Sequence, residues 1–162
     1  MTGYLHLVAG KIAAGKSTLA QKLSEEHGCV LLSEDAWLSG LFGPELTSIK
    51  DYVRYSARLR DIMGNHVVEV LRLGTSVVLD FPANTPETRL WMREVIDLSG
   101  CDHSLHLLNV SDDICKARLH SRNASGEHQF SVSDEEFDAI TRHFVRPAAS
   151  EGFSVREYLE TV

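Results

Sequence analysis

The residues whose types and spacing are most specific for chemistry lie near the amino terminus, in a glycine-containing loop. Residues 10–17 read Gly-Lys-Ile-Ala-Ala-Gly-Lys-Ser and fit the pattern G-x-x-x-x-G-K-[S/T]. Glycines let the backbone curl so that its N–H groups face a polyphosphate, and a helix that begins near Lys16 adds its positive dipole end. We expect Lys16 to reach the β- and γ-phosphates of a nucleoside triphosphate and the Ser17 hydroxyl to bind Mg²⁺. The residues expected to contact the nucleotide are Gly10, Ala13, Ala14, Gly15, Lys16, Ser17 and Thr18.

Two further acids follow the second expected strand, in the run Ser33-Glu34-Asp35. A carboxylate at this position would stand opposite the γ-phosphate, where it can take the proton of an attacking hydroxyl group. We take Asp35 as the first candidate for this base and Glu34 as the alternative. The competing interpretation is that Ser33 or Asp35 only caps the helix that contains Trp37.

A third acid, Asp80, directly follows the apolar run Val77–Leu79. Its position at a strand end indicates a second group at the Mg²⁺ site, beside Ser17, or a substrate contact. The alternative is a turn-forming aspartate before a loop that contains a proline. Asn84 is a weaker candidate, because an asparagine before Thr85-Pro86 is typical of ordinary turn chemistry.

Two arginines near the carboxyl-terminal third complete the set of candidate catalytic groups, which are Asp35, Lys16, Arg118 and Arg122. Arg118 and Arg122 are four residues apart and share one face of an expected helix. The polar stretch that follows, at about residues 123–133, is expected to form a short lid. Guanidinium groups beside such a lid would neutralise charge that develops during phosphoryl transfer and help exclude water. A solvated basic face is the alternative, and Arg142 and Arg146 are weaker candidates.

These side chains meet only if the fold brings distant segments together, and the pattern of the chain predicts such a fold. Apolar runs predict strands at Tyr4–Ala9, Val30–Leu32, Ser76–Leu79, His103–Asn109 and Phe153–Tyr158. Periodicity and capping patterns predict helices over 16–27, 51–73, 85–100 and 111–122, and from 133 to Pro147. A bend or break is expected at Gly64-Asn65, and Trp91, Val95 and Leu98 are expected to form a buried face.

Alternation of strands and helices is typical of an α/β protein with three layers, α/β/α, around a mostly parallel sheet of about five strands. Ligands of such sheets bind at the carboxyl ends of the strands, which is where the phosphate loop, Asp35 and Asp80 fall. The length favours a single domain over residues 1–162.

Composition excludes several function classes. The net charge is −7, from 16 basic and 23 acidic residues, which disfavours binding to nucleic acid or to anionic membranes. No run of about 20 apolar residues occurs, and the amino terminus is too short and polar for a signal peptide, so we expect a cytoplasmic protein. The N-K-x-D run that reads guanine in GTPases is absent, which favours ATP over GTP.

Taken in order along the chain, these motifs resemble those of P-loop small-molecule kinases of the zeta-toxin-like, AAA-type group. Chloramphenicol phosphotransferase and polynucleotide kinase are relatives of this group, and the chain is also similar to bacterial AAA-family ATP-binding proteins. The resemblance implies that Asp35 orients and deprotonates the acceptor and that Arg118 and Arg122 are lid arginines. Polynucleotide kinases carry an arginine three residues after the aspartate, for the phosphate of the acceptor, and here that position is Leu38. This departure argues against a nucleic-acid end as the substrate.

The sequence therefore predicts an enzyme that uses ATP and Mg²⁺ to phosphorylate a hydroxyl group of a small molecule, with ATP hydrolysis as the fallback activity. The helix over 51–73 begins with Tyr52 and Tyr55, which could line an acceptor pocket. A nucleoside or nucleotide kinase is one alternative, and its acceptor phosphate would need Arg54 and Arg58. A nucleotide-dependent switch or ATPase that acts on a protein partner is another. We expect a monomer or a homodimer.

Overall fold

The structure is a computed structural model and describes residues 1–126 and 131–159. Within these residues the strands are β1 (Tyr4–Ala9), β2 (Val30–Ser33), β3 (Val77–Pro82), β4 (Asp102–Asn109) and β5 (Val155–Leu159). The α-helices are α1 (Lys16–His27), α2 (Glu34–Phe42), α3 (Ile49–Arg72), α4 (Pro86–Ser99), α5 (Asp112–Ser125) and α6 (Asp134–Thr141), and short 3-10 helices cover Gly43–Glu45 and Ala149–Glu151. Each expected strand forms within a few residues of its expected bounds.

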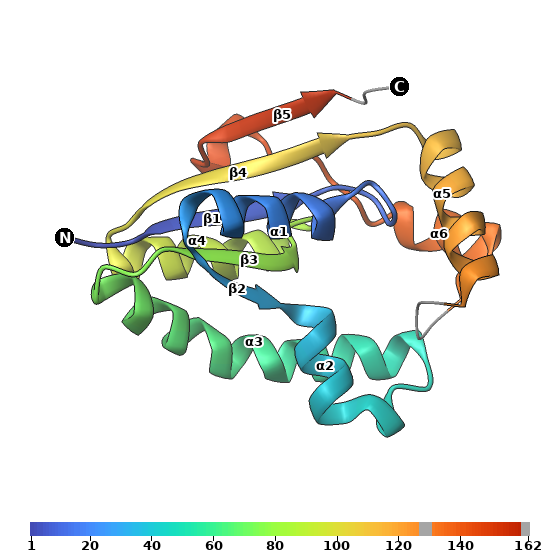
Figure 1. The fold of residues 1–162 in the computed structure, drawn as a ribbon, viewed down its shortest axis with the longest axis horizontal. Helices are drawn as coiled ribbons and strands as arrows, with labels where there is room; N and C mark the ends of the chain where they lie inside the picture. Colours follow the sequence, from blue (N-terminus) through green and yellow to red (C-terminus); the bar gives the residue numbers. More distant parts are fainter. Residues whose placement is uncertain (127–130, 160–162) are drawn as a thin grey trace.

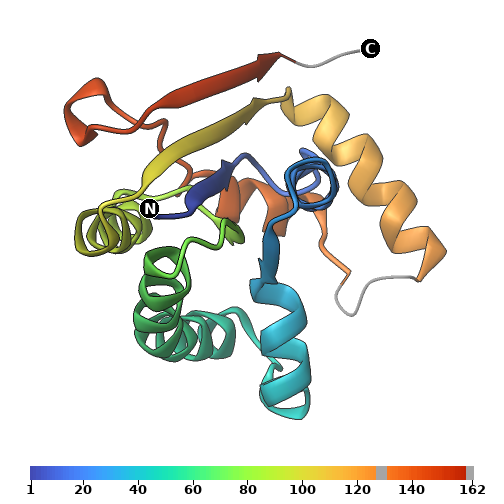
Figure 2. The same ribbon diagram turned by 60° about the vertical axis from the view of Figure 1, so that its left-hand side comes forward.

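The strands form one parallel sheet in the order β2-β3-β1-β4-β5, with α1 on one face and α3 and α4 on the other (Figures 1 and 2). Alternation along β1 produces these layers, because Val8 packs against Ala20 and Leu23 of α1, whereas Leu5 and Leu7 face the larger core beneath α3 and α4. The carboxyl ends of the strands lie along one edge of the sheet, beside α2, α5 and α6 (Figure 1).

The strand β3 contains an irregularity that local patterns do not predict. Leu7 of β1 pairs with Leu79, but the next residue, Val8, pairs with Pro82, so the register shifts by two residues. The amide of Ala83 then donates to the carbonyl of Val8 at 2.9 Å. Bulges of this kind bend a strand and redirect the side chains around them. This one lies at Asp80, at the edge of the sheet where the candidate site is expected.

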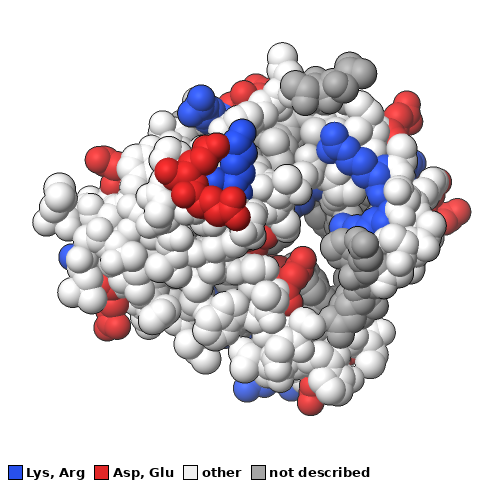
Figure 3. Space-filling model, viewed as in Figure 1, with Lys and Arg blue, Asp and Glu red and all other residues white. Residues whose placement is uncertain are grey.

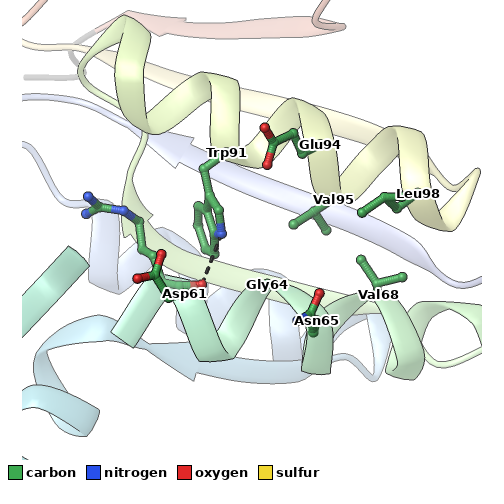
Figure 4. A pocket seen from close by; sticks show the side chains of 9 residues that line it. Asp61, Gly64, Asn65, Val68, Trp91, Glu94, Val95 and Leu98 are labelled. Atoms are coloured by element: carbon green, nitrogen blue, oxygen red, sulfur yellow. Dashed lines mark hydrogen bonds between the residues drawn. The ribbon is translucent and has the colours of Figure 1, made fainter. Parts of the chain in front are cut away.

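The long helix α3 is continuous, so the expected bend at Gly64-Asn65 is wrong. A β-carbon at Gly64 would lie 2.7 Å from Nε1 of Trp91, so this glycine instead allows the indole of α4 to approach α3. The indole N–H donates to the carbonyl of Arg60 at 3.1 Å. The expected buried face of α4 is also partly wrong, because Leu98 is 57% exposed. A hollow of about 140 Å³ beside the tryptophan is lined by Arg60, Asp61, Gly64, Asn65, Val68, Trp91, Glu94, Val95 and Leu98 (Figure 4).

The segment after β4 also differs from its expected bounds. Helix α5 continues to Ser125 and ends at Gly126, so the first residues of the expected lid are helical, and residues 127–130 of that lid lie outside the described part of the chain. Helix α6 begins with the expected capping box at Ser133 but ends at Thr141, well before Pro147. Among the helices in residues 1–126 and 131–159, none is both long and apolar enough to cross a bilayer.

Candidate active site

The loop between β1 and α1 presents backbone N–H groups at the end of a helix. Ala13 and Gly15 have positive φ angles of 63° and 102°, and the amide of Ala14 closes a turn on the carbonyl of Lys11 at 3.1 Å. The first N–H groups of a helix have no acceptor within that helix. Gly15 provides no side-chain cap for α1, and the first turn contains no acidic residue. These amides and the positive dipole end therefore face the loop, which is the arrangement that binds phosphate.

The other five α-helices in the described residues start differently. Each has a serine or threonine whose hydroxyl oxygen accepts a backbone N–H of the first turn: Ser33, Ser48, Thr85, Ser111 and Ser133. Ser33 accepts from the amide of Ala36 at 3.2 Å, so the cap of α2 is Ser33 and Asp35 is not needed for it.

Lys16 lies at the centre of the charged groups. Its Nζ donates to the carbonyls of Gly10 at 2.7 Å and of Lys11 at 2.8 Å. Burial lowers the pKa of Lys16 to about 8, the carboxylates of Asp80 and Asp35 act in the opposite direction, and the charge of Arg122 lowers it further. Residues of the phosphate loop, α2, β3 and α5 are thus close enough to act on one ammonium group.

Ser17 and Asp80 form a pair of oxygen donors at the start of α1. The Ser17 hydroxyl donates to Oδ2 of Asp80 at 2.8 Å, and Asp80 is largely buried. Burial raises the pKa of Asp80, whereas the hydrogen bond from Ser17 and the charge of Lys16 lower it. The described residues contain no group of three or more His, Cys, Asp or Glu side chains that could hold a metal ion by themselves. A pair of oxygens fits Mg²⁺ of the kind that arrives with a nucleotide and keeps water and phosphate ligands.

The two neighbouring acids of α2 have different surroundings. Glu34 is only 3% exposed and accepts a hydrogen bond from the hydroxyl of Tyr52 on α3. Burial raises the pKa of Glu34 to about 7; the bond from Tyr52 and the charge of Arg60 lower it, and the charge of Asp35 raises it. Asp35 is exposed. Of the two candidate bases, Asp35 is therefore the one that a substrate can reach.

The two arginines of α5 lie against the phosphate loop in different ways. Nη1 of Arg118 makes long hydrogen bonds to the carbonyls of Ala13 at 3.4 Å and Ala14 at 3.3 Å. Arg122 is partly buried, and its Nε is a buried donor for which the described residues provide no acceptor. Figure 3 shows a hollow at this edge, with acidic side chains toward α2 and basic side chains toward α5.

Other expected residues do not join the site as it is described. Arg54 lies over the ring of Tyr55, with 5.5 Å from its guanidinium carbon to the ring centroid, and Arg58 is exposed on α3. Arg146 pairs with Glu157 of β5 at 2.9 Å. The cation whose charge acts on Glu34 is Arg60, which no sequence motif singles out. Its Nη1 donates to the Ser56 hydroxyl one helical turn away.

Comparison with known proteins identifies a matching family and solved structures with a similar fold. A family model described as an AAA domain matches residues 5–147. No curated protein matches the chain. Among solved structures, a candidate kinase from Chloroflexus aurantiacus is 22% identical, with a TM-score of 0.79, covering 98% of this chain and 85% of that chain.

Two further structures are similar along most of their length. APS kinase from Mycobacterium tuberculosis, in complex with AMPPNP and APS, is 19% identical, with a TM-score of 0.62 and coverage of 98% of this chain and 88% of that chain. A gluconokinase from Sinorhizobium meliloti is 14% identical, with a TM-score of 0.58 and coverage of 96% and 82%. At these identities the likeness establishes the fold, and the expected α/β fold of the P-loop NTPase kind is confirmed.

Proposed function

The chain belongs to the AAA domain family, and from that premise we propose that it transfers the γ-phosphoryl group of ATP, in the presence of Mg²⁺, to a hydroxyl group of a small molecule. The observation that carries this proposal is the convergence on Lys16. The charges of Asp35, Asp80 and Arg122 all act on its ammonium group. A kinase needs a carboxylate near the phosphate-binding lysine to accept the proton of the acceptor hydroxyl, and Asp35 could do this. The kinases among the similar structures support the same reaction class.

The nucleotide half of the proposed site consists mainly of backbone. The amides at the start of α1 and the ammonium group of Lys16 would bind the triphosphate. Ser17 and Asp80 would hold Mg²⁺, which supplies a positive charge that neutralises the phosphate oxygens. The bond between the Ser17 hydroxyl and Asp80 already places these two oxygens 2.8 Å apart.

The acceptor half depends on Asp35. Its carboxylate would align the acceptor hydroxyl with the γ-phosphorus and take the hydroxyl proton as the new O–P bond forms and the bond to the β-phosphate oxygen breaks. Glu34 is buried against Tyr52, so we assign it to the packing of α2 against α3 and not to contact with the acceptor. Arg118 and Arg122 would stabilise the negative charge that spreads over the transferred group.

The experiment that tests this proposal is a screen of hydroxyl compounds with ATP labelled at the γ-phosphate. Sugars, polyols, nucleosides and nucleoside monophosphates are incubated with the wild-type chain and with Asp35→Asn. We expect label on a small neutral hydroxyl compound, and its loss in the variant. Label on nucleoside monophosphates alone would indicate a nucleotide kinase. Free phosphate in equal amounts from both proteins, with no labelled compound, would contradict kinase activity and favour the ATPase alternative.

Several finer assignments are also part of this proposal. Membership of the zeta-toxin-like subgroup, the need for Mg²⁺, the cytoplasmic location and the monomeric or homodimeric state all stay predictions. An equilibrium sedimentation run and an assay with and without EDTA test the oligomeric state and the metal requirement directly.

A further inference from the structure

Asn84, a weaker candidate on the sequence pattern, makes two hydrogen bonds to the first residue of the phosphate loop. Its Oδ1 accepts from the amide of Gly10 at 2.9 Å, and its Nδ2 donates to the carbonyl of Gly10 at 2.7 Å. These are the two bonds that a neighbouring strand would make to a strand residue. The side chain of Asn84 thus extends the pairing of β1 beyond the end of the β3 backbone.

The bulge in β3 places Asn84 at this position. Up to Leu7 the paired residues of β1 and β3 differ by 72 in number, and from Val8 onward they differ by 74. Without the shift, Gly10 would stand opposite Pro82, which has neither a backbone N–H nor a polar side chain. With the shift, Gly10 stands opposite Asn84.

A buried arginine holds the backbone next to Asn84 and the segment that bonds the Asn84 carbonyl. Arg89 of α4 is 1% exposed, and its Nη1 donates to the carbonyls of Ala83 at 3.0 Å and Val145 at 2.7 Å. The amide of Val145 donates to the carbonyl of Asn84 at 2.9 Å, and Nε of Arg89 pairs with Glu151 at 2.7 Å. These bonds fix the backbone at Asn84 and therefore the position of its side chain relative to the loop.

The carbonyl of Gly10 also accepts a hydrogen bond from Lys16, and this shared acceptor connects Asn84 to the nucleotide site. Lys16 has three N–H donors, and two of them are used on the carbonyls of Gly10 and Lys11. To make more than one bond to a triphosphate, the lysine must give up at least one of these carbonyls. The Gly10 residue is buried, so its carbonyl would then have no partner unless Asn84 kept it.

We infer that Asn84 is a positioning residue of the nucleotide site: it fixes Gly10 and keeps the Gly10 carbonyl paired when Lys16 turns to the phosphates. This inference rests on the proposed function, because it assumes that the loop binds a triphosphate. Asn84 does not touch the nucleotide in this role and acts through Gly10 and Lys16.

Two substitutions separate this role from a purely structural one. Asn84→Ala removes both bonds, and we expect it to weaken binding of Mg·AMPPNP about 10-fold. Asn84→Asp keeps the acceptor for the Gly10 amide but loses the donor to the Gly10 carbonyl, and its charge favours Lys16 in its unbound position. We expect it to weaken binding about 100-fold, because the new oxygen faces the Gly10 carbonyl in place of the lost donor and its charge competes for Lys16. In both variants the affinity should fall by more than the loss of stability accounts for.

Isothermal titration with Mg·AMPPNP measures the affinity of each variant, and thermal unfolding of the full chain measures its melting temperature. Asn65→Asp on the exposed side of α3 is the matched control for the added charge, with an expected change in affinity of less than 3-fold. If affinity falls only in proportion to stability, or if both variants bind as the wild type does, Asn84 has no positioning role. If Asn84→Ala does not fold, the near-isosteric Asn84→Asp with its control still decides the question. If the wild-type chain itself binds no AMPPNP, the proposed function fails and this role fails with it.

Discussion

The two halves of the candidate site are built in different ways. The nucleotide half uses backbone amides, a helix terminus without a side-chain cap, and a lysine and serine fixed by neighbouring groups. The acceptor half uses side chains of α2 and α3, of which one acid is exposed and its neighbour is buried against a tyrosine. A backbone cradle recognises phosphate whatever the acceptor is, whereas under the proposed function the side chains of α2 and α3 would decide which hydroxyl compound fits. Substitutions in the two halves should therefore have different kinetic signatures.

The largest effect is expected in the nucleotide half, from Lys16→Ala. Removing the lysine that bonds the carbonyls of Gly10 and Lys11 should reduce ATP turnover about 10³-fold and weaken ATP binding, because the triphosphate loses its principal cation. Steady-state kinetics and isothermal titration measure the two quantities. Lys22→Ala, on the exposed side of α1, is the matched control. Unchanged turnover in Lys16→Ala would remove the basis of the nucleotide half.

The acceptor half is tested by Asp35→Asn, which should lower phosphoryl transfer about 10²-fold and leave ATP affinity close to that of the wild type. The change removes a proton acceptor without altering the loop. Glu34→Gln provides the comparison on the same helical turn and should retain transfer within a few-fold. A collapse of ATP affinity in Asp35→Asn would assign Asp35 to the nucleotide half, and the reverse pattern in the two variants would make Glu34 the base.

A smaller effect is expected from Arg122→Ala, at the boundary between the halves. Turnover should fall roughly tenfold, with ATP affinity within about threefold of the wild type, because Arg118 still supplies positive charge beside the loop. Arg72→Ala, at the exposed carboxyl end of α3, is the control. A defect in binding alone would show that Arg122 holds the ground-state nucleotide and has no part in the transition state.

An effect of another kind, on stability rather than on turnover, concerns Glu34. Its pKa is raised to about 7 in the folded chain, above the ordinary value of 4.5, so the folded state binds more protons than the unfolded state between these pH values. The contribution of Glu34 to stability is therefore present below pH 4.5 and is lost as the pH rises through 7. Relative to the wild type, Glu34→Gln should gain about 3 kcal/mol between pH 4.5 and pH 8. Denaturant unfolding at several pH values measures this difference, and a constant difference would contradict the buried, protonated state of Glu34.

The predictable and unpredictable parts of this molecule differ in the range of the interactions that create them. The phosphate loop follows from a contiguous motif, and Asp35 and Asp80 follow from the rule that parallel strands end at one edge. The bulge at Asp80 and the bonds from Asn84 to Gly10 depend on the register between strands more than 70 residues apart, which local patterns do not encode.

The acceptor side was less predictable for a related reason. The pairing of Glu34 with Tyr52 and the charge of Arg60 near them depend on how α3 packs against α2, since all three residues fit ordinary helical patterns. The bend predicted at Gly64 does not form, because a glycine in a helix has the same local signature whether it breaks the helix or makes room for a neighbouring tryptophan.

A crystal structure of the chain with AMPPNP and Mg²⁺ tests the central claim most directly. We expect the triphosphate to lie over residues 10–18, with Nζ of Lys16 on a phosphate oxygen, the ion beside Ser17 and Asp80, and Asn84 still bonded to Gly10. A loop that keeps Lys16 on the carbonyls of Gly10 and Lys11, with the nucleotide bound elsewhere or not bound, would contradict the account.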